Sequence, residues 1–249
     1  MRITVVTAVW NRAETVEDAL ESVASQDHRD VEHVVQDGGS TDGTQEILQS
    51  RENIALVSEP DDGIYDAINR GIARSTGEIV GLLHSDDVFA SQSVLSRVAE
   101  AFVDPEVDAV YGDLDYVAAT NLSKVIRHWS PGHFTPQKLA RGWMPPHPTL
   151  YLRRNVFETC GLYDTSYRIA GDYDGILRYF SQPGFKAVHV PEVLVKMRVG
   201  GASNRSLSHI LRKSREDFRA LRKNEVGGVM ALAAKNLSKV GQFLPVGTK

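Results

Sequence analysis

Residues 78–87, Glu-Ile-Val-Gly-Leu-Leu-His-Ser-Asp-Asp, join a short apolar run to two adjacent carboxylates. The run has the length and character of a strand that is buried on both faces of a parallel sheet. Ligands of open α/β sheets collect beyond the carboxyl ends of the strands, and Mg²⁺ prefers carboxylate and phosphate oxygens. Asp86 and Asp87 therefore indicate a site for a metal-bound diphosphate. The alternative role for both residues is to cap the helix that follows.

Strand-like and helix-like patterns alternate through the first half of the chain. Strands are expected at residues 3–9, 31–36, 54–58 and 78–83, and helices at 16–23, 44–51 and 64–74. This order predicts an α/β fold with a mainly parallel sheet flanked by helices, in which the loops after the strands meet at one edge. Those loops are residues 7–12, 37–43, 59–63 and 84–87, and three of the four are rich in carboxylates.

The second half of the chain is less regular. A helical stripe is expected at 94–102, strands at 107–111, 149–153 and 186–199, and a helix at 172–180. Residues 128–148 hold five of the ten prolines, so we expect a shaped loop that forms the wall of a second binding site. Two further helices are expected at 206–224, which is strongly basic, and at 229–240.

The composition is that of a globular chain of 249 residues with a net charge of -4. The basic residues do not form one long block, so nucleic-acid binding is not indicated. No apolar run approaches the ~20 residues of a membrane-spanning helix and no signal peptide is visible, which predicts a cytoplasmic location. The basic segment 206–240 fits either packing on its own domain or peripheral contact with the inner face of a membrane, and packing is favoured. Cys160 is expected to be a packing residue.

Five motifs follow one another along residues 1–87. They are Asn11-Arg12, the glycine-rich loop 37–44, the segment 59–71, Gly77-Glu78 and Ser85-Asp86-Asp87. In this order they resemble glycosyltransferase family 2, and the resemblance covers roughly residues 1–200. It implies a GT-A (Rossmann-like) fold, a nucleotide-diphosphate sugar as donor, a divalent Mg²⁺ or Mn²⁺ ion and inversion at the anomeric carbon.

The resemblance also suggests boundaries within the chain. Residues 1–204 would form the GT-A catalytic domain, with the nucleotide-sugar-binding part at 1–112 and the acceptor-binding part at 113–204. Residues 205–249 would form an appendage of C-terminal basic amphipathic helices. Whether the protein forms oligomers is left open.

The family motifs imply roles for individual acids of this chain. Asp87 is the implied metal ligand, and Asp86 would lie nearer the ribose or sugar. Asp37 would contact the nucleobase or ribose, and the third-strand loop would face the nucleoside through Asp61 or Asp62. The further residues expected at the donor are Thr7, Asn11, Arg12, Gly38 and Arg198.

Transfer with inversion needs a base for the proton of the acceptor hydroxyl, and Asp172 matches the family's position for it, with a helix cap as the alternative. Gly171 departs from the family pattern, which has Glu before the base. At Gly38 many members carry a second acid, so Asp61 or Asp62 is expected to replace that contact. His84-Ser85 likewise stands where Asn-Ala is common.

The acceptor side is less defined. Trp143 and His147 could present an aromatic face and an imidazole to a sugar, with core packing as the alternative for both. His189 is expected to be structural. Arg198 and residues 200–203 would close over the diphosphate, where a cation suits the leaving group.

The expected function is an inverting, metal-dependent transfer of a single sugar to a glycan or lipid-linked acceptor, in cell-surface polysaccharide or glycolipid assembly. The chain lacks the Gln-x-x-Arg-Trp element of processive synthases. One alternative is a sugar-phosphate nucleotidyltransferase, although residues 7–12 lack the glycine-rich phosphate loop of such enzymes. The other is a non-catalytic nucleotide- or carbohydrate-binding module, against which Asp87 and Asp172 argue.

Overall fold

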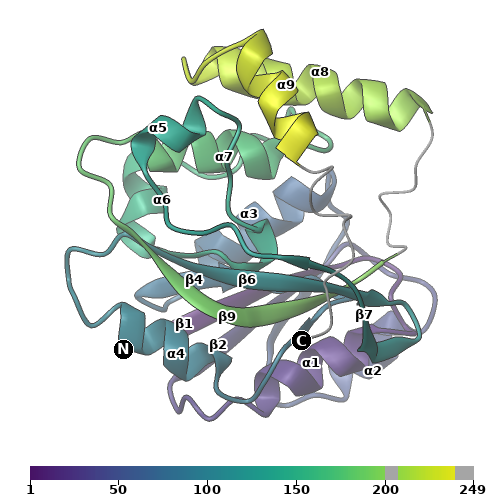
Figure 1. Ribbon diagram of the computed structural model, residues 1–249. Coiled ribbons are helices and arrows are strands. Elements are labelled where there is room, and N and C mark those ends of the chain that lie inside the picture. The colour runs from purple at the N-terminus through teal and green to yellow at the C-terminus, as the bar shows by residue number, and fades with distance from the viewer. Residues whose placement is uncertain (200–206, 239–249) are drawn as a thin grey trace.

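One mixed sheet crosses the centre of the computed structural model, which describes residues 1–199 and 207–238. In these residues the sheet has nine strands in the order β3-β2-β1-β4-β8-β6-β9-β5, with β7 paired to β6. Helices α1, α2 and α4 cover one face, and α3, α5, α6 and α7 cover the other (Figure 1). The fold is therefore a three-layer α/β arrangement, as the sequence predicts.

The first half of the chain forms the parallel part of the sheet. Its strands are β1 (Ile3–Val9), β2 (Val31–Asp37), β3 (Ala55–Ser58) and β4 (Ile79–Leu82). Its helices are α1 (Val16–Ala24), α2 (Thr44–Gln49) and α3 (Ile64–Arg74). Val5 and Val6 point to opposite faces of β1 and both are buried, because helices cover the sheet on both sides.

The second half adds strands of both directions. Its strands are β5 (Val88–Phe89), β6 (Ala109–Ala118), β7 (Asn121–Trp129), β8 (Tyr151–Arg153) and β9 (Ala187–Arg198). Its helices are α4 (Val94–Ala101), α5 (Pro136–Leu139), the 3-10 turn η1 (His147–Thr149), α6 (Arg154–Cys160) and α7 (Gly171–Phe180).

This half extends one expected strand and adds antiparallel pairs to the sheet. The strand expected at 107–111 continues to Ala118 and turns into β7, which the sequence did not reveal because most of its side chains are exposed. The sheet is also mixed, since β8 runs antiparallel to both β4 and β6. Hydrophobic pattern shows that a strand is buried but does not show its direction.

The strands that matter for the site nevertheless point the same way. β1 is parallel to β2 and β4, β2 to β3, and β6 to β9. Because β8 is antiparallel to β4 and to β6, these six strands share one direction. Their carboxyl ends lie on the right of Figure 1, where β9 ends.

The C-terminal helices α8 (Leu207–Lys223) and α9 (Val229–Ser238) lie over α7, away from the sheet (Figure 1). Ala220, Leu221 and Ala231 join the apolar cluster that contains Ile176 and Leu177 of α7. None of the helices in the described parts of the chain is long and apolar enough to cross a membrane. The segment expected to be an appendage is thus packed on α7.

Candidate active site

The loops that follow β1, β2 and β4 are locked together by hydrogen bonds. The backbone N–H of Asn11 donates to Ser40 Oγ over 2.8 Å, and the N–H of Thr41 donates to Asn11 Oδ1 over 2.9 Å. Asn11 has a φ of 50°, a left-handed conformation that Asn tolerates better than most residues. Thr15 Oγ1 donates to the carbonyl of Ser85 over 3.0 Å, which ties the first loop to the acidic turn. Asn11 therefore shapes the site through its own side chain.

Asp37 organises the second loop from inside the protein. Its carboxylate has no exposed surface and accepts hydrogen bonds from the N–H groups of Gly39 and Ser40, at 3.2 and 3.1 Å. It also accepts one from Ser58 Oγ at 2.6 Å, so it links β2 to β3. In this arrangement Asp37 fixes the shape of the loop.

The space beside Gly38 is filled by Asp61. A Cβ atom at residue 38 would lie 2.4 Å from Asp61 Oδ2, far inside normal contact distance. The other carboxylate oxygen of Asp61 accepts the N–H of Gly63 at 2.8 Å, which holds the side chain in place, whereas Asp62 is exposed. The carboxylate of Asp61 thus occupies the space that the side chain of an acid at position 38 would need. Trp10, 65% exposed, flanks the same spot, with Cδ1 3.5 Å from the added Cβ.

Asp87 carries a buried carboxylate oxygen that lacks a hydrogen-bond partner among the described residues. Its Oδ1 accepts the backbone N–H of Arg198 at 3.2 Å, but its Oδ2 has no such donor. Burial, assisted by the neighbouring charge of Asp86, raises the pKa of Asp87 well above its ordinary value. Both observations describe a carboxylate that a bound cation would stabilise.

Arg198, at the end of β9, forms hydrogen bonds with the acidic turn. Its side chain is 8% exposed and donates to the carbonyl oxygens of Asp86, at 2.7 Å, and Ala119, at 3.2 Å. It also pairs with Asp18 of α1. The bonds to Asp86 and Asp87 hold the acidic turn, and those to Ala119 and Asp18 fix the buried guanidinium beside it. Residues 200–203, expected beside it at the diphosphate, lie outside the described residues.

Asp172 lies in the first turn of α7. Tyr65 Oη lies 3.3 Å from Asp172 Oδ1. Burial raises the pKa of Asp172, but positive charge at His147, Lys213 and Lys235 outweighs burial and brings the pKa below its ordinary value. Burial lowers the pKa of His147 itself to about 4, so at neutral pH the cations that act on Asp172 are the two lysines of α8 and α9.

His84 connects the two acidic regions. Burial lowers its pKa, while the charges of Asp86 and Asp172 both act to raise it, so the imidazole is within electrostatic reach of both carboxylates. The ring of His84 lies 5.9 Å from that of His147, measured between centroids. The acidic turn after β4 and the start of α7 therefore lie in the same region of the structure.

The residues expected on the acceptor side make internal contacts. Trp143 Nε1 donates to the carbonyl of Pro131 over 2.8 Å, and its ring packs edge-on against Tyr111 at 5.6 Å. His147 is buried and its Nε2 lies 3.2 Å from Tyr163 Oη. For Trp143 these are the contacts of the packing alternative, whereas His147 lies within electrostatic reach of Asp172.

Two other expected residues lie at the margins of the site. Thr7 is fully buried within β1, where its hydroxyl is 3.0 Å from His33 Nε2, so the structure does not bring it to the cluster. Arg12 is half-buried and its Nη1 donates to the carbonyl of Asn11 over 3.0 Å. Cys160 is packed against the core, and burial raises the pKa of its thiol, which fits a packing residue.

Sequence reasoning did not identify Tyr65 or Glu216 as part of this region. Tyr65 precedes Asp66 in a segment that resembles the family, yet only its contact with Asp172 reveals its place. Glu216 lies in the basic segment far along the chain, and its carboxylate accepts the N–H groups of Ile169 and Ala170, directly before α7. No sequence signal links it to the site.

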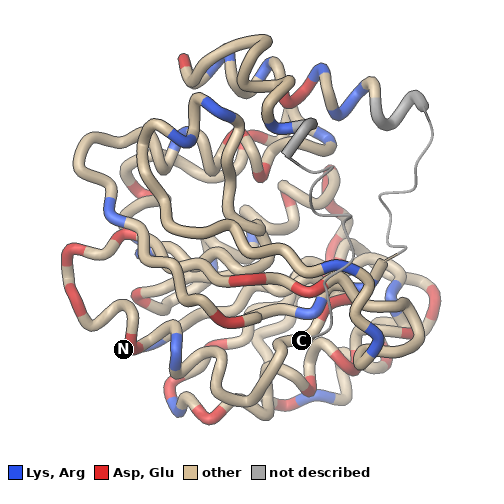
Figure 2. The backbone as a smooth tube through the Cα atoms, viewed as in Figure 1, with Lys and Arg blue, Asp and Glu red and all other residues tan. Residues whose placement is uncertain are grey.

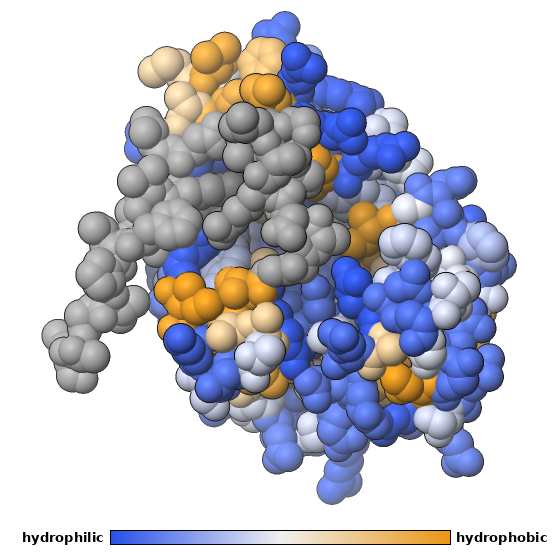
Figure 3. All heavy atoms as spheres, turned by 90° about the vertical axis from the view of Figure 1, so that its right-hand side faces the viewer, coloured by the Kyte–Doolittle hydropathy of each residue, from blue (hydrophilic) through white to orange (hydrophobic). Residues whose placement is uncertain are grey.

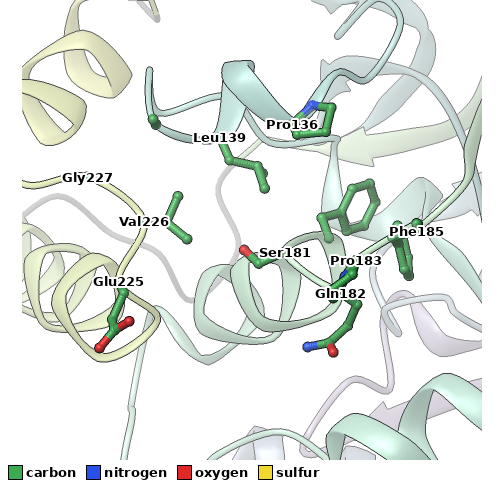
Figure 4. Close-up of a pocket in the computed structure, with 12 residues that line it drawn as sticks. Pro136, Leu139, Ser181, Gln182, Pro183, Phe185, Glu225, Val226 and Gly227 are labelled. Atoms are coloured by element: carbon green, nitrogen blue, oxygen red, sulfur yellow. The ribbon is translucent and has the colours of Figure 1, made fainter.

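Cavities and acidic clusters give no competing site. A pocket of about 500 Å³ lies between α5, the end of α7 and the α8–α9 connection, where Leu139, Phe185 and Val226 surround it (Figure 4). It is at the opposite end of α7 from Asp172. Within the described residues, no three His, Cys, Asp or Glu side chains converge on a point that could hold a metal ion. A metal at Asp87 would therefore need oxygen ligands from its substrate and from water.

Comparisons with known proteins agree with this geometry. The model of the glycosyl transferase family 2 matches residues 4–167. A PGL/p-HBAD biosynthesis glycosyltransferase of Mycobacterium bovis is 33% identical over 201 residues, which is 78% of this chain and 76% of the relative.

Solved structures share the fold at low identity. TarS of S. aureus in complex with UDP-GlcNAc has a TM-score of 0.69 at 16% identity, covering 95% of this chain and 70% of that one. Against a longer TarS structure this chain spans 43% of the length. The mannosyltransferase PcManGT of Pyrobaculum calidifontis, in complex with GDP-Man and Mn²⁺, has a TM-score of 0.66 at 21% identity, covering 94% and 68%. The family model, which matches more than half of the chain, and the mycobacterial relative together show that the chain belongs to glycosyltransferase family 2.

Proposed function

We propose that this protein is an inverting, metal-dependent glycosyltransferase that moves a single sugar from a nucleotide-diphosphate sugar to an acceptor hydroxyl. The observation that carries the proposal is the buried, unpartnered Oδ2 of Asp87, in the same region as the Asp172 carboxylate in the first turn of α7. One carboxylate is suited to a cation and the other to a proton. Such a transfer must neutralise the negative charge on the leaving diphosphate and remove the proton of the acceptor hydroxyl.

The donor nucleoside would bind at the loops after β1, β2 and β3. Asp61, placed against Gly38, and the exposed Asp62 would accept hydrogen bonds from the ribose or base. Trp10 offers an exposed ring beside Gly38 on which a base can stack. The complexes of TarS with UDP-GlcNAc and of PcManGT with GDP-Man support a nucleotide-sugar donor.

Asp87, with Asp86 beside it, would hold Mn²⁺ or Mg²⁺. When bound, the ion would neutralise charge on the diphosphate as it leaves. The donor set fits such an ion, because hard cations prefer carboxylate oxygens and accept phosphate and water as the remaining ligands. Arg198 contributes by fixing the turn that carries both acids.

Asp172 would act as the base. The oxygen of the acceptor hydroxyl forms a bond to the anomeric carbon from the face opposite the diphosphate, and the bond between that carbon and the phosphate oxygen breaks. The nucleoside diphosphate leaves with the electron pair, and the hydroxyl proton passes to Asp172. At neutral pH the positive charges of Lys213 and Lys235 favour the ionised form of this carboxylate.

For the acceptor we propose a glycan or lipid-linked hydroxyl in cell-surface polysaccharide or glycolipid assembly. The mycobacterial relative is named as a biosynthesis glycosyltransferase. Leu211, Val229 and Met230 are exposed on α8 and α9. Apolar residues gather at the top of the molecule in Figure 3, the end at which α8 and α9 lie in Figure 1. Lys and Arg recur on the same helices in Figure 2. This surface supports our proposal of peripheral contact with an anionic membrane from its cytoplasmic side.

The test begins with binding. Nucleoside diphosphates with uridine or guanosine are screened for thermal stabilisation with and without Mn²⁺, because a ligand that binds only the folded state raises its stability. The stabilising nucleotide then selects the sugar donors for a transfer assay that detects free nucleoside diphosphate. Metal-dependent stabilisation and release of nucleoside diphosphate are expected. A parallel assay supplies a nucleoside triphosphate and a sugar phosphate, and release of pyrophosphate there would support the nucleotidyltransferase alternative. Binding without turnover on any acceptor would support a non-catalytic module.

A further inference from the structure

The segment directly before Asp172 is held by a carboxylate from another helix. Glu216 of α8 accepts the backbone N–H groups of Arg168 at 3.4 Å, Ile169 at 2.8 Å and Ala170 at 3.0 Å. The first N–H groups of a helix have no partner within the helix, and a negative charge beside them is favourable. Ala170, the N-cap residue of α7, provides no side-chain cap of its own. Glu216 therefore supplies from α8 what a capping side chain normally supplies locally.

The same segment is held on its other side by Tyr65 of α3. Tyr65 Oη donates to the carbonyl of Ile169 over 2.7 Å, and the same hydroxyl oxygen lies 3.3 Å from Asp172 Oδ1. A Cβ atom at Gly171 would lie 2.8 Å from the Tyr65 ring, so this ring occupies the space of a side chain at 171. The backbone that carries Asp172 thus lies between a hydroxyl donor and a carboxylate acceptor.

Helix α8 is itself fixed relative to α7. The fully buried Asp174 accepts Lys223 Nζ at 3.2 Å and Asn224 Nδ2 at 3.0 Å. On the next turn of α8, Asp217 pairs with Lys235 of α9 at 2.8 Å, with both side chains 2% exposed. Because α8 is fixed at these points, Glu216 holds the backbone before α7 in one position.

We propose that Glu216 is a positioning residue that sets the place of the Asp172 carboxylate and so makes the C-terminal helices part of the active site. This inference rests on the proposed function of Asp172 as the base. Loss of the carboxylate frees the three N–H groups of residues 168–170, directly before α7, and lets the first turn of α7 shift. A misplacement of about 1 Å in a reacting group lowers a rate by ~100-fold.

The experiment compares Glu216→Ala and Glu216→Gln with wild type, using the full chain. The control is Arg215→Ala, which changes the exposed neighbour of Glu216 on the same helix. Three quantities are measured for each protein: kcat for transfer, the Kd of the donor nucleotide with Mn²⁺, and hydrogen exchange of the amides of Ile169 and Ala170. For Glu216→Ala we expect kcat to fall by about 10- to 100-fold, nucleotide Kd to stay within about twofold of wild type, and both amides to exchange faster.

The conservative variant separates positioning from general loss of structure. Glu216→Gln keeps an acceptor oxygen at the same distance, so it should retain more of the kcat than Glu216→Ala, with protection of the two amides restored in parallel. An active wild type whose Glu216→Ala variant keeps its kcat while the amides lose protection would overturn the inference. So would an equal loss of nucleotide binding and kcat. Failure of the proposed function looks different, because wild type and Arg215→Ala would then both lack transfer.

Discussion

Replacement of Lys235 by Met tests how firmly the C-terminal helices are joined to the catalytic half. Lys235 pairs with Asp217 at 2.8 Å, both side chains are 2% exposed, and its Nζ lies 3.0 Å from the ring centroid of Tyr173. Removing one partner of a buried pair leaves the other charge uncompensated, which typically costs about 3–5 kcal/mol. Lys213 remains 3.6 Å from Asp217 and partly compensates, so we expect the lower end, about 3 kcal/mol.

The measurement is the free energy of unfolding from urea titration followed by circular dichroism. For a chain of this size the expected loss corresponds to a fall in Tm of about 6–12 °C. The control is Lys213→Met, whose pair is 37% exposed on the lysine side and should contribute at most about 1 kcal/mol. The double variant Lys235→Met with Asp217→Leu should recover most of the stability, because a buried pair can be replaced by apolar residues. A loss below about 1 kcal/mol for Lys235→Met would refute the reasoning.

The remaining predictions concern the site. Asp172→Asn should lower transfer by about 10²- to 10⁴-fold with donor binding unchanged, and a variant with more than about a tenth of the wild-type rate would place the base elsewhere. Gly38→Ala should weaken nucleotide binding about tenfold, because its Cβ would lie 2.4 Å from Asp61 Oδ2, while Gly228→Ala, with open space around it, is the neutral control. Burial lowers the pKa of His147 to about 4 from an ordinary value of 6.5, so the unfolded chain takes up its proton first as pH falls. From pH 7 to pH 5 this should remove about 2 kcal/mol of stability in urea titrations, and His147→Gln should show a smaller loss; equal pH dependence in both proteins would contradict the assignment.

The parallel half of the fold could be predicted from the sequence because its strands are buried on both faces. Such strands appear as uninterrupted apolar runs, and β1 to β4 lie within one or two residues of the expected positions. β7 could not be predicted in the same way. It has no buried face, and residues such as Lys124 and Arg127 leave no period in its pattern.

Motif order brought the acids of the candidate site together but could not assign their contacts. Asp87 comes shortly after the end of β4, and Asp172 lies at the start of α7. The sequence pattern indicates both of these element ends. Asp61 fills the space of a side chain at position 38, and Glu216 accepts hydrogen bonds from the backbone before α7. Both contacts join residues that are distant in the chain, so the sequence pattern does not show them. Thr7 is expected at the donor from its place in the motif, but it lies inside β1 and its side chain contacts His33.

The central claim is that Asp87 holds the metal through which the donor binds. Isothermal titration of the stabilising nucleoside diphosphate, with and without Mn²⁺, measures this directly in wild type and Asp87→Ala. In wild type we expect Mn²⁺ to tighten binding by at least about tenfold, equivalent to about 1.4 kcal/mol, and in Asp87→Ala we expect Mn²⁺ to have no effect. An Asp87→Ala variant that keeps the full effect of Mn²⁺ would contradict the account.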